Sequence, residues 1–292
     1  MIVDPSEIST GRLHAIMLGA IAPRPIAFAS TIDKNGRVNL SPYSFFNAFG
    51  SNPATLIFSP ARRVRDNTIK HTLENVMEVP EVVINVVNYD MVQQMSLSST
   101  EYPKGVSEFA KSGFTEEPSL KVKPPRVKES PVQFECKVKD VIHLGDQGGA
   151  GNLIVCEIVL VHVNDLVLDA NHGIDQQKID LVSRMGGNWY CRAHGAALFE
   201  VEKPISSLGI GVDSIPDSIR FSPILTGNNL GMLGNVEELP DKVAVETFRN
   251  SSERDVLMNS APSADFALHR VAAKLLDEGE VRKAWLLLLS GD

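Results

Sequence analysis

Four cationic side chains gather within nine residues of an otherwise acidic chain. They are Arg62, Arg63, Arg65 and Lys70. An apolar segment at 54–58 precedes them, and capping residue types at 66–68 predict a helix from about residue 67 to 76. A strand, a basic loop and a helix N-terminus form a natural phosphate site, because free N–H groups, the helix dipole and guanidinium groups all favour a dianion. The alternative is a basic loop that only faces solvent.

Short hydroxyl and amide side chains interrupt two apolar segments just upstream. The first segment ends in Ser30 and Thr31, and the second runs from Asn39 to Asn47. Asp-Lys-Asn-Gly at 33–36 is a strong hairpin turn signal between them. Convergent donors with apolar flanks suit a heteroaromatic ring, although hydroxyl residues on a strand often just face solvent.

Other possible sites lack the pattern that their chemistry needs. The glycine-rich segment 145–152 lies between two predicted strands and opens no helix, so it indicates a flexible hairpin loop rather than a nucleotide-binding loop. Cys191 and His194 have the spacing of half a zinc site, but no second pair follows, and we expect no metal. The sequence holds no G-x-S-x-G motif, which leaves a serine hydrolase unsupported.

The elements that must position these residues are mostly short strands. Turn signals and apolar runs predict strands at 24–31, 38–44, 54–58, 82–87, 132–143 and 153–163, with a second short helix at 89–98. This spacing indicates a small barrel rather than a doubly wound sheet, and therefore a mainly β fold.

The last third of the chain has a different character. Residues 205–240 are dense in Gly, Pro, Ser and Asn, whereas the pattern at 264–289 predicts helix, with a break at Gly279. We therefore expect a barrel domain over 1–200 and a C-terminal extension over 201–292, made of a loop-rich cap plus terminal helices.

Composition excludes several classes of protein. The 292 residues carry 28 Lys and Arg against 36 Asp and Glu, a net charge of −8, which argues against nucleic-acid binding. The longest apolar runs are far shorter than a membrane span, and no basic residue precedes Arg12, so no secretory signal is indicated. Three cysteines exclude a disulfide scaffold. A cytoplasmic protein without a membrane or nucleic-acid partner is expected.

Read in order, these segments resemble the flavin reductase-like family, whose members include flavoredoxins. The matching stretches are RPIAFAST at 24–31, NLSPYSFF at 39–46, LIFS at 56–59, KHTLEN at 70–75 and RMGGNWY at 184–190. The resemblance covers about residues 5–200. His71 stands where many members carry an acid, and the loop before it is unusually rich in arginine.

The resemblance implies a six-stranded, Greek-key split β-barrel that binds FMN at a homodimer interface and uses NAD(P)H as co-substrate. It implies phosphate contacts from Ser59, Arg62, Arg65, Asn67, Thr68, Lys70 and Thr72. Ser30, Thr31, Asn39, Ser41, Ser44 and Asn47 would line the isoalloxazine and ribityl groups. The substrate side would be formed by Trp189, Tyr190 and His194, which could equally pack the barrel mouth. No catalytic residue is nominated, because hydride chemistry belongs to the cofactor.

Two functions from different classes are compatible with the sequence. The first is an FMN-dependent NAD(P)H:flavin oxidoreductase, which passes electrons from NAD(P)H or a protein donor to a flavin or another acceptor. The second is a non-catalytic FMN protein, either an electron carrier of the flavoredoxin type or a flavin store. A barrel that has lost its cofactor is disfavoured by the intact Ser, Asn and Arg positions.

Overall fold

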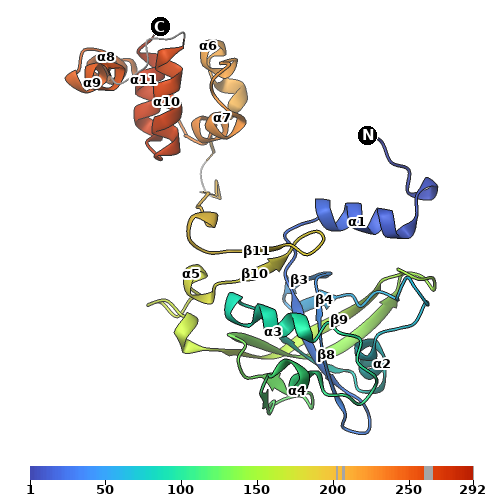
Figure 1. The fold of residues 1–292 in the computed structure, drawn as a ribbon. Coiled ribbons are helices and arrows are strands. Elements are labelled where there is room, and N and C mark those ends of the chain that lie inside the picture. The colour runs from blue at the N-terminus through green and yellow to red at the C-terminus, as the bar shows by residue number, and fades with distance from the viewer. Residues whose placement is uncertain (202, 206–207, 260–265, 292) are drawn as a thin grey trace. The chain divides into compact units, whose positions relative to one another are not determined.

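The structure, a computed structural model, describes residues 1–201, 203–205, 208–259 and 266–291 (Figure 1). The chain divides into two compact units, Met1–Phe199 and Glu200–Asp292. The first unit is built on a large antiparallel sheet, and the second is helical. Each unit is described by itself.

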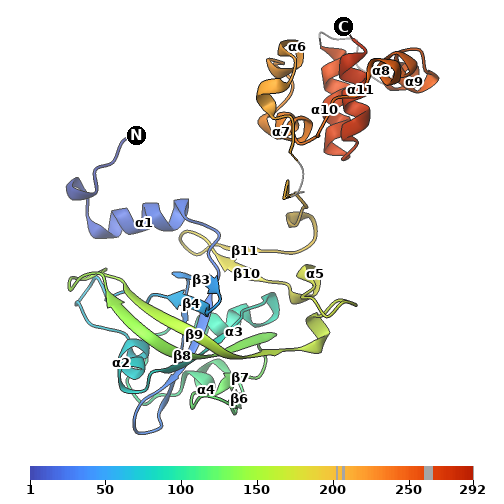
Figure 2. The same ribbon diagram turned by 180° about the vertical axis from the view of Figure 1, so that it is seen from behind.

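The main sheet of the first unit has seven strands, in the order β2-β1-β5-β8-β9-β4-β3. All neighbouring pairs are antiparallel. The strands are β1 (Ala27–Ile32), β2 (Val38–Tyr43), β3 (Phe46–Ser51), β4 (Ala54–Phe58), β5 (Glu81–Asn85), β8 (Val132–His143) and β9 (Asn152–Val163). The long β8–β9 hairpin crosses the unit in both views (Figure 2).

The seventh strand, β3, is the one that the sequence did not predict. Its last five residues are exposed, so it has no alternation of buried and exposed positions to reveal it. It follows β2 after only Ser44 and Phe45, yet β2 and β3 lie at opposite edges of the sheet. The sheet must therefore curl until these two edges approach each other.

Asp33 organises the turn between β1 and β2 at the predicted place. Its carboxylate accepts hydrogen bonds from the backbone N–H groups of Asn35 and Arg37, each at 2.9 Å. These bonds and the Arg37 guanidinium hold the pKa of Asp33 at about 2. Gly36 has φ +82°, a left-handed conformation that glycine adopts without strain. The predicted hairpin is confirmed by the pairing of β1 with β2.

Two apolar clusters lie on the two faces of the sheet. In the first, Leu73 and Val76 of α2 (His71–Glu78) pack against barrel residues such as Phe58. In the second, α3 (Val92–Leu97) and α4 (Glu108–Ser112) contribute residues to a cluster that contains Phe28 and Leu40.

Smaller elements complete the first unit. They are α1 (Thr10–Ala20), α5 (Gln176–Ile179), β6 (Glu116–Glu117), β7 (Arg126–Val127), β10 (Val182–Arg184), β11 (Tyr190–Arg192) and the 3₁₀ helices η1 (Pro5–Glu7), η2 (Tyr89–Met91), η3 (Asp165–Val167) and η4 (Gly195–Ala197).

Helix α2 begins later than the sequence suggests. Its N-cap is Lys70, and Asp66 does not cap it. Asp66 instead accepts bonds from the backbone N–H and the hydroxyl of Thr68, at 3.1 and 2.6 Å. Asn67 has φ +57°, outside the helical region. The capping residue types at 66–68 thus form a turn inside the basic loop, because Asp and Asn side chains stabilise turns as readily as helix starts.

Within its described residues, the second unit contains the 3₁₀ helix η5 (Val212–Ser214) and six α-helices. The α-helices are α6 (Asp217–Arg220), α7 (Gly227–Gly234), α8 (Lys242–Arg249), α9 (Ser252–Asn259), α10 (Ala267–Asp277) and α11 (Val281–Leu289). Gly279, at φ +80°, separates α10 from α11 as the sequence suggests. Residues 227–234 are helical rather than loop-like, because Thr226 and Asn229 form a capping box that starts α7.

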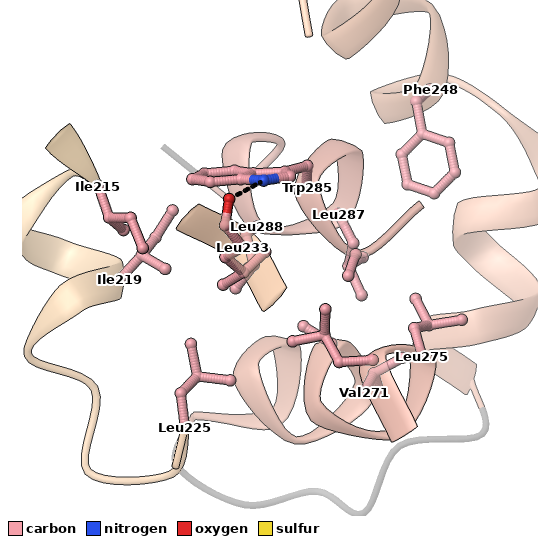
Figure 3. Packing of buried hydrophobic residues seen from close by; sticks show 13 residues of the cluster. Ile215, Ile219, Leu225, Leu233, Phe248, Val271, Leu275, Trp285, Leu287 and Leu288 are labelled. Atoms are coloured by element: carbon pink, nitrogen blue, oxygen red, sulfur yellow. Dashed lines mark hydrogen bonds between the residues drawn. The ribbon is translucent and has the colours of Figure 1, made fainter. Parts of the chain in front are cut away.

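Trp285 lies at the centre of the second unit's apolar core (Figure 3). Its side chain is 1% exposed, and its indole Nε1–H donates to the carbonyl of Leu233 at 3.1 Å. The bond joins α11 to α7, so one residue fixes two helices both by packing and by a polar contact. Among the helices that the structure describes, none combines the length and apolar character required to cross a bilayer.

Trp285→Ala is expected to unfold the second unit selectively. Truncating a fully buried Trp costs about 3–5 kcal/mol of unfolding free energy, because a cavity remains. Pulse proteolysis of the full chain would report separately on fragments from the two units. Val243→Ala, at a side chain 76% exposed on α8, is the control and should change stability by less than about 0.5 kcal/mol. Loss of both units together in Trp285→Ala would show that they fold as one cooperative domain.

Candidate functional site

Three cations of the basic loop converge on one carboxylate, that of Glu101. Glu101 Oε1 accepts from Arg63 Nε at 2.6 Å and from Lys70 Nζ at 3.2 Å. Its Oε2 accepts from an Nη of Arg65 at 3.1 Å. These contacts, the Arg63 hydrogen bond first, hold the pKa of Glu101 at about 2. The loop therefore already binds an anion, which the chain itself supplies.

Asn39 and Tyr43 of β2 and Thr72 of α2 lie beside these cations and form a polar wall. Asn39 Nδ2 and Tyr43 Oη both donate to Thr72 Oγ1, at 2.9 and 2.8 Å. An open hollow lies between the wall, the cations and the chain after α3. Its lining residues are Asn39, Ser41, Tyr43, Arg63, Lys70, His71, Ser98, Ser99, Thr100, Glu101, Tyr102 and Glu108.

Burial shifts the pKa of three titratable groups around this hollow in the direction that favours their uncharged forms. Desolvation raises the pKa of the Tyr43 phenol, so that it remains a hydrogen-bond donor. It also raises the pKa of Glu108, whose carboxylate accepts from Leu40 N–H at 3.2 Å. For His71, burial lowers the pKa, and the nearby Lys104, Arg63 and Lys70 charges act in the same direction. The positive charge of the hollow therefore comes from its arginine and lysine side chains.

The glycine-rich segment between β8 and β9 supports the backbone of the basic loop. Arg62 N–H donates to the Ala150 carbonyl at 2.8 Å, and Gly149 N–H donates to the Arg62 carbonyl at 3.0 Å. A Cβ on Gly148 would lie 3.0 Å from the carbonyl oxygens of both Arg63 and Val64. The segment forms the predicted hairpin connection, and Gly148 allows it to pack closely against the backbone of the basic loop.

Ser59 also helps to hold the backbone at the start of the basic loop. Its Oγ accepts from Asn152 N–H at 3.0 Å, and Asn152 Nδ2 donates to the Pro60 carbonyl at 2.9 Å. Arg62 and Asn67 bind each other, since Arg62 Nε donates to Asn67 Oδ1 at 2.6 Å. Asn67 in turn donates to the Asp146 carbonyl at 2.9 Å. Among the predicted phosphate residues, Ser59, Arg62 and Asn67 thus shape the loop, whereas Arg65 and Lys70 bind the anion.

Thr68 helps to hold Arg63, one of the three residues that contact Glu101. Its Oγ1 accepts from an Nη of Arg63 at 2.9 Å and donates to Asp66. The same Nη donates to the Ile69 carbonyl at 2.6 Å. These contacts fix the guanidinium that Glu101 contacts. Thr72, the last of the predicted phosphate residues, lies in the polar wall.

Ser30 and Thr31 do not line the hollow. Both side chains are fully buried on β1. Thr31 Oγ1 accepts from Asn75 Nδ2 at 3.1 Å, and within the part of the chain that the structure describes Ser30 Oγ has no hydrogen-bond partner. Of the residues predicted for the ring and ribityl groups, the structure brings Asn39 and Ser41 to the hollow.

Ser44 and Asn47 lie beyond the end of β2. Ser44 Oγ accepts from Arg24 Nε at 3.4 Å. Arg24 is 5% exposed and also donates to the carbonyls of Leu18 and Met185, at 2.7 and 2.9 Å, so it joins α1 and the chain after β10 to this corner. Asn47 is exposed on β3, where its Oδ1 accepts from Ala48 N–H.

The predicted substrate-side residues gather at the β10–β11 hairpin and the chain after it. Trp189 is 77% exposed, and Tyr190 stacks beneath the Arg184 guanidinium at 4.6 Å from ring centroid to Cζ. His194 Nδ1 lies 3.7 Å from Asp180 Oδ1. None of the three is among the residues that line the hollow.

Arg63, Tyr43, His71 and Glu101 line the hollow but are not among the site residues that the resemblance implies, although the cationic run at 62–70 includes Arg63. Arg63 belongs to the same cationic run as Arg62, and only the loop's three-dimensional path decides which guanidinium faces the anion. Glu101 follows Lys70 by 31 residues, and no local motif marks it. A charge count could have suggested that the cations need an anionic partner, but not which one.

Comparison with known proteins identifies the family of the chain. Residues 18–177 match the family model described as "Flavin reductase like domain", and these make up more than half of the chain. An uncharacterized protein of Aquifex aeolicus is 38% identical over 195 residues, which cover 67% of this chain and 97% of that protein.

Two solved structures share the fold of the first unit. Nitrilotriacetate monooxygenase component B from Bacillus cereus superposes with a TM-score of 0.64 at 27% identity, covering 69% of this chain and 98% of that one. A protein with a split barrel domain from Shewanella frigidimarina gives a TM-score of 0.58 at 27% identity, covering 69% of this chain and all of that one. The first unit is thus a split barrel, and the chain belongs to the flavin reductase-like family of flavin-related oxidoreductases.

Proposed function

We propose that the protein is an FMN-dependent oxidoreductase that takes hydride from NAD(P)H and passes electrons to a free flavin or another acceptor. The observation that carries the proposal is the cluster of Arg63, Arg65 and Lys70 around one carboxylate, beside a polar wall, within a family domain named for flavin reduction. The cluster supports a flavin that bears a phosphate, because three cations at one point suit a phosphate group, which riboflavin lacks.

The residues around the hollow fit such a flavin. Arg63, Arg65 and Lys70 would hold the phosphate, since guanidinium and ammonium groups bind phosphate as they bind the Glu101 carboxylate here. Asn39, Ser41 and Tyr43 would face the ribityl chain and the ring, which need hydrogen-bond partners with apolar flanks. When bound, the flavin supplies the hydride acceptor and donor.

The chain's own residues act by binding and orienting. Tyr43 stays protonated, since burial raises its pKa, and its hydroxyl orients Thr72. The glycine-rich segment holds the backbone of the basic loop, so the cations reach the phosphate without being reordered. Preorganised donors and charges need no rearrangement during the reaction, which is how they lower its barrier. No side chain is assigned the role of acid or base.

We also propose that two copies of the chain associate through their first units. Helix α1 has no buried residue, although most of its side chains are apolar, and Met17 is 40% exposed. On β9, Val161 and Val163 are 44% and 37% exposed. Monomeric proteins rarely leave such aliphatic surface uncovered, and a homodimer is the commonest way to cover it.

Removing two cations should weaken FMN binding without affecting riboflavin. In Arg63→Gln/Lys70→Gln, the loss of charge-assisted hydrogen bonds should raise the FMN Kd about 100-fold and reduce its salt dependence, while the riboflavin Kd changes by less than about threefold. Quenching of flavin fluorescence measures both constants. Lys128→Gln, at an exposed lysine outside the hollow, is the control. Equal weakening of both ligands would show that the basic loop is not the phosphate site.

The proposed reaction has a direct spectroscopic test. The FMN-loaded protein, mixed anaerobically with NADH and in parallel with NADPH, should lose its visible flavin absorbance within seconds with one of the two. Added free FMN should then be reduced over many turnovers. A flavin spectrum that neither nucleotide bleaches would support an electron carrier or flavin store in place of the reductase. If no flavin binds, both functions are wrong.

The proposed dimer should dissociate when charges are placed on the aliphatic surface. Met17→Asp/Val161→Asp puts two carboxylates where apolar contact is expected, and burying them unpaired costs several kcal/mol. Analytical ultracentrifugation should show a dimer for the wild type and a monomer for this variant. Val243→Asp/Val256→Asp, at two exposed positions of the second unit, should remain dimeric. A monomeric wild type, or a dimer that both variants retain, would contradict the proposal.

A further inference from the structure

The segment from Ser98 to Gly105 connects α3 to α4 and lies along the hollow. Ser98 through Tyr102 form part of the hollow's lining. Two charged residues attach the segment to the basic loop and α2: Glu101 contacts three cations of the loop, and Lys104 Nζ contacts Glu74 Oε2 at 2.9 Å. Ion pairs therefore join this side of the hollow to the basic loop and to α2.

Glu101 lies where three cations of the basic loop converge. Its two carboxylate oxygens contact three cations, with N···O distances of 2.6, 3.1 and 3.2 Å. The Arg63 side chain is only 17% exposed, so its charge is partly withdrawn from water. A phosphate dianion that entered this cluster would meet the Glu101 carboxylate at hydrogen-bonding range of the same donors. Two anions cannot share these donors without repulsion, since like charges at this range repel each other strongly where water is partly excluded.

We infer that Glu101 is an internal competitor of the cofactor phosphate, and that FMN binding displaces this carboxylate from Arg63, Arg65 and Lys70. This inference rests on the proposed function. A carboxylate carries one negative charge and the phosphate close to two, so the cations bind the phosphate more strongly than Glu101. Because the contacts with Glu101 are lost in the exchange, FMN binds less tightly than it would to free cations. Riboflavin has no phosphate and leaves Glu101 in place. Glu101 thus determines how strongly the hollow distinguishes phosphorylated from unphosphorylated flavin.

Removing a competitor and removing a structural residue change FMN affinity in opposite directions. If Glu101 mainly positioned the cations, its removal would loosen them and weaken FMN binding. If it competes, its removal leaves three cations without their anion, and FMN binds more tightly. Glu101 is 42% exposed on a connecting segment, so its replacement leaves the barrel core intact.

Glu101→Gln in the full-length, flavin-free protein provides the test. Glutamine keeps the size and a hydrogen-bonding oxygen but removes the charge. We expect the FMN Kd to fall at least tenfold and the riboflavin Kd to stay within twofold. Inorganic phosphate should compete with FMN at a concentration lower by a similar factor. Glu116→Gln, on the short strand β6, makes the same change in net charge away from the hollow and should alter neither constant by more than twofold.

The outcomes separate this inference from the proposed function. An unchanged or higher FMN Kd in Glu101→Gln, with riboflavin still bound, overturns the competitor role but leaves FMN binding in place. A wild type that binds neither flavin overturns the proposed function itself. Glu101→Ala, which removes the carboxylate without offering an amide, must show the same tightening of FMN. If only the glutamine variant tightened, the added amide would be the cause, and the competitor role would be wrong.

Discussion

The connection between β2 and β3 is only two residues long, and the shape of the first unit depends on it. Laid flat, seven strands at their usual spacing would separate the two edges by about 29 Å. Two residues bridge only about 11 Å between the Cα atoms that flank them. The sheet must therefore close on itself. The short connection also contacts the chain after β4. Ser59 N–H donates to the carbonyl of Phe45, and so the end of β2 lies near Ser59.

The hollow follows from that closure. Asn39 and Tyr43 arrive on β2, Thr72 on α2, and the cations on the loop between β4 and α2. None of these elements alone holds a ligand, since each contributes one side of the hollow. The chain is acidic overall, so a local excess of positive charge persists only where fixed geometry holds it. Here that geometry comes from hydrogen bonds such as those that join Arg62 to Asn67 and Arg63 to the Ile69 carbonyl.

Sequence patterns predicted most of the scaffold because they reflect local physics. Alternating and continuous apolar runs located β1, β4, β5, β8 and β9, and the Asp-Lys-Asn-Gly turn located the first hairpin. The strand β3 has no buried face and gave no such signal. The start of α2 was placed too early, because residues that favour helix caps also favour turns.

Site residues were harder to predict because the direction of a side chain depends on long-range packing. Neighbouring residues of a strand point to opposite faces, so Ser30 and Thr31 could not both line one hollow, and in the structure neither does. In a loop, no period decides between Arg62 and Arg63. Glu101 joins the site only through the path of the chain between α3 and α4, which no local motif encodes.

The glycine-rich segment shows that the absence of a Cβ can have more than one structural consequence. A run of glycines suggests mobility, because glycine restricts the backbone least. The same lack of a Cβ allows two backbones to approach closely, and at Gly148 that approach is to the carbonyls of Arg63 and Val64. Contact between backbones leaves side chains free for other partners. The backbone and the side chains of the basic loop therefore have different roles. The β8–β9 connection holds the backbone, and the side chains of Arg63, Arg65 and Lys70 bind an anion that can be exchanged.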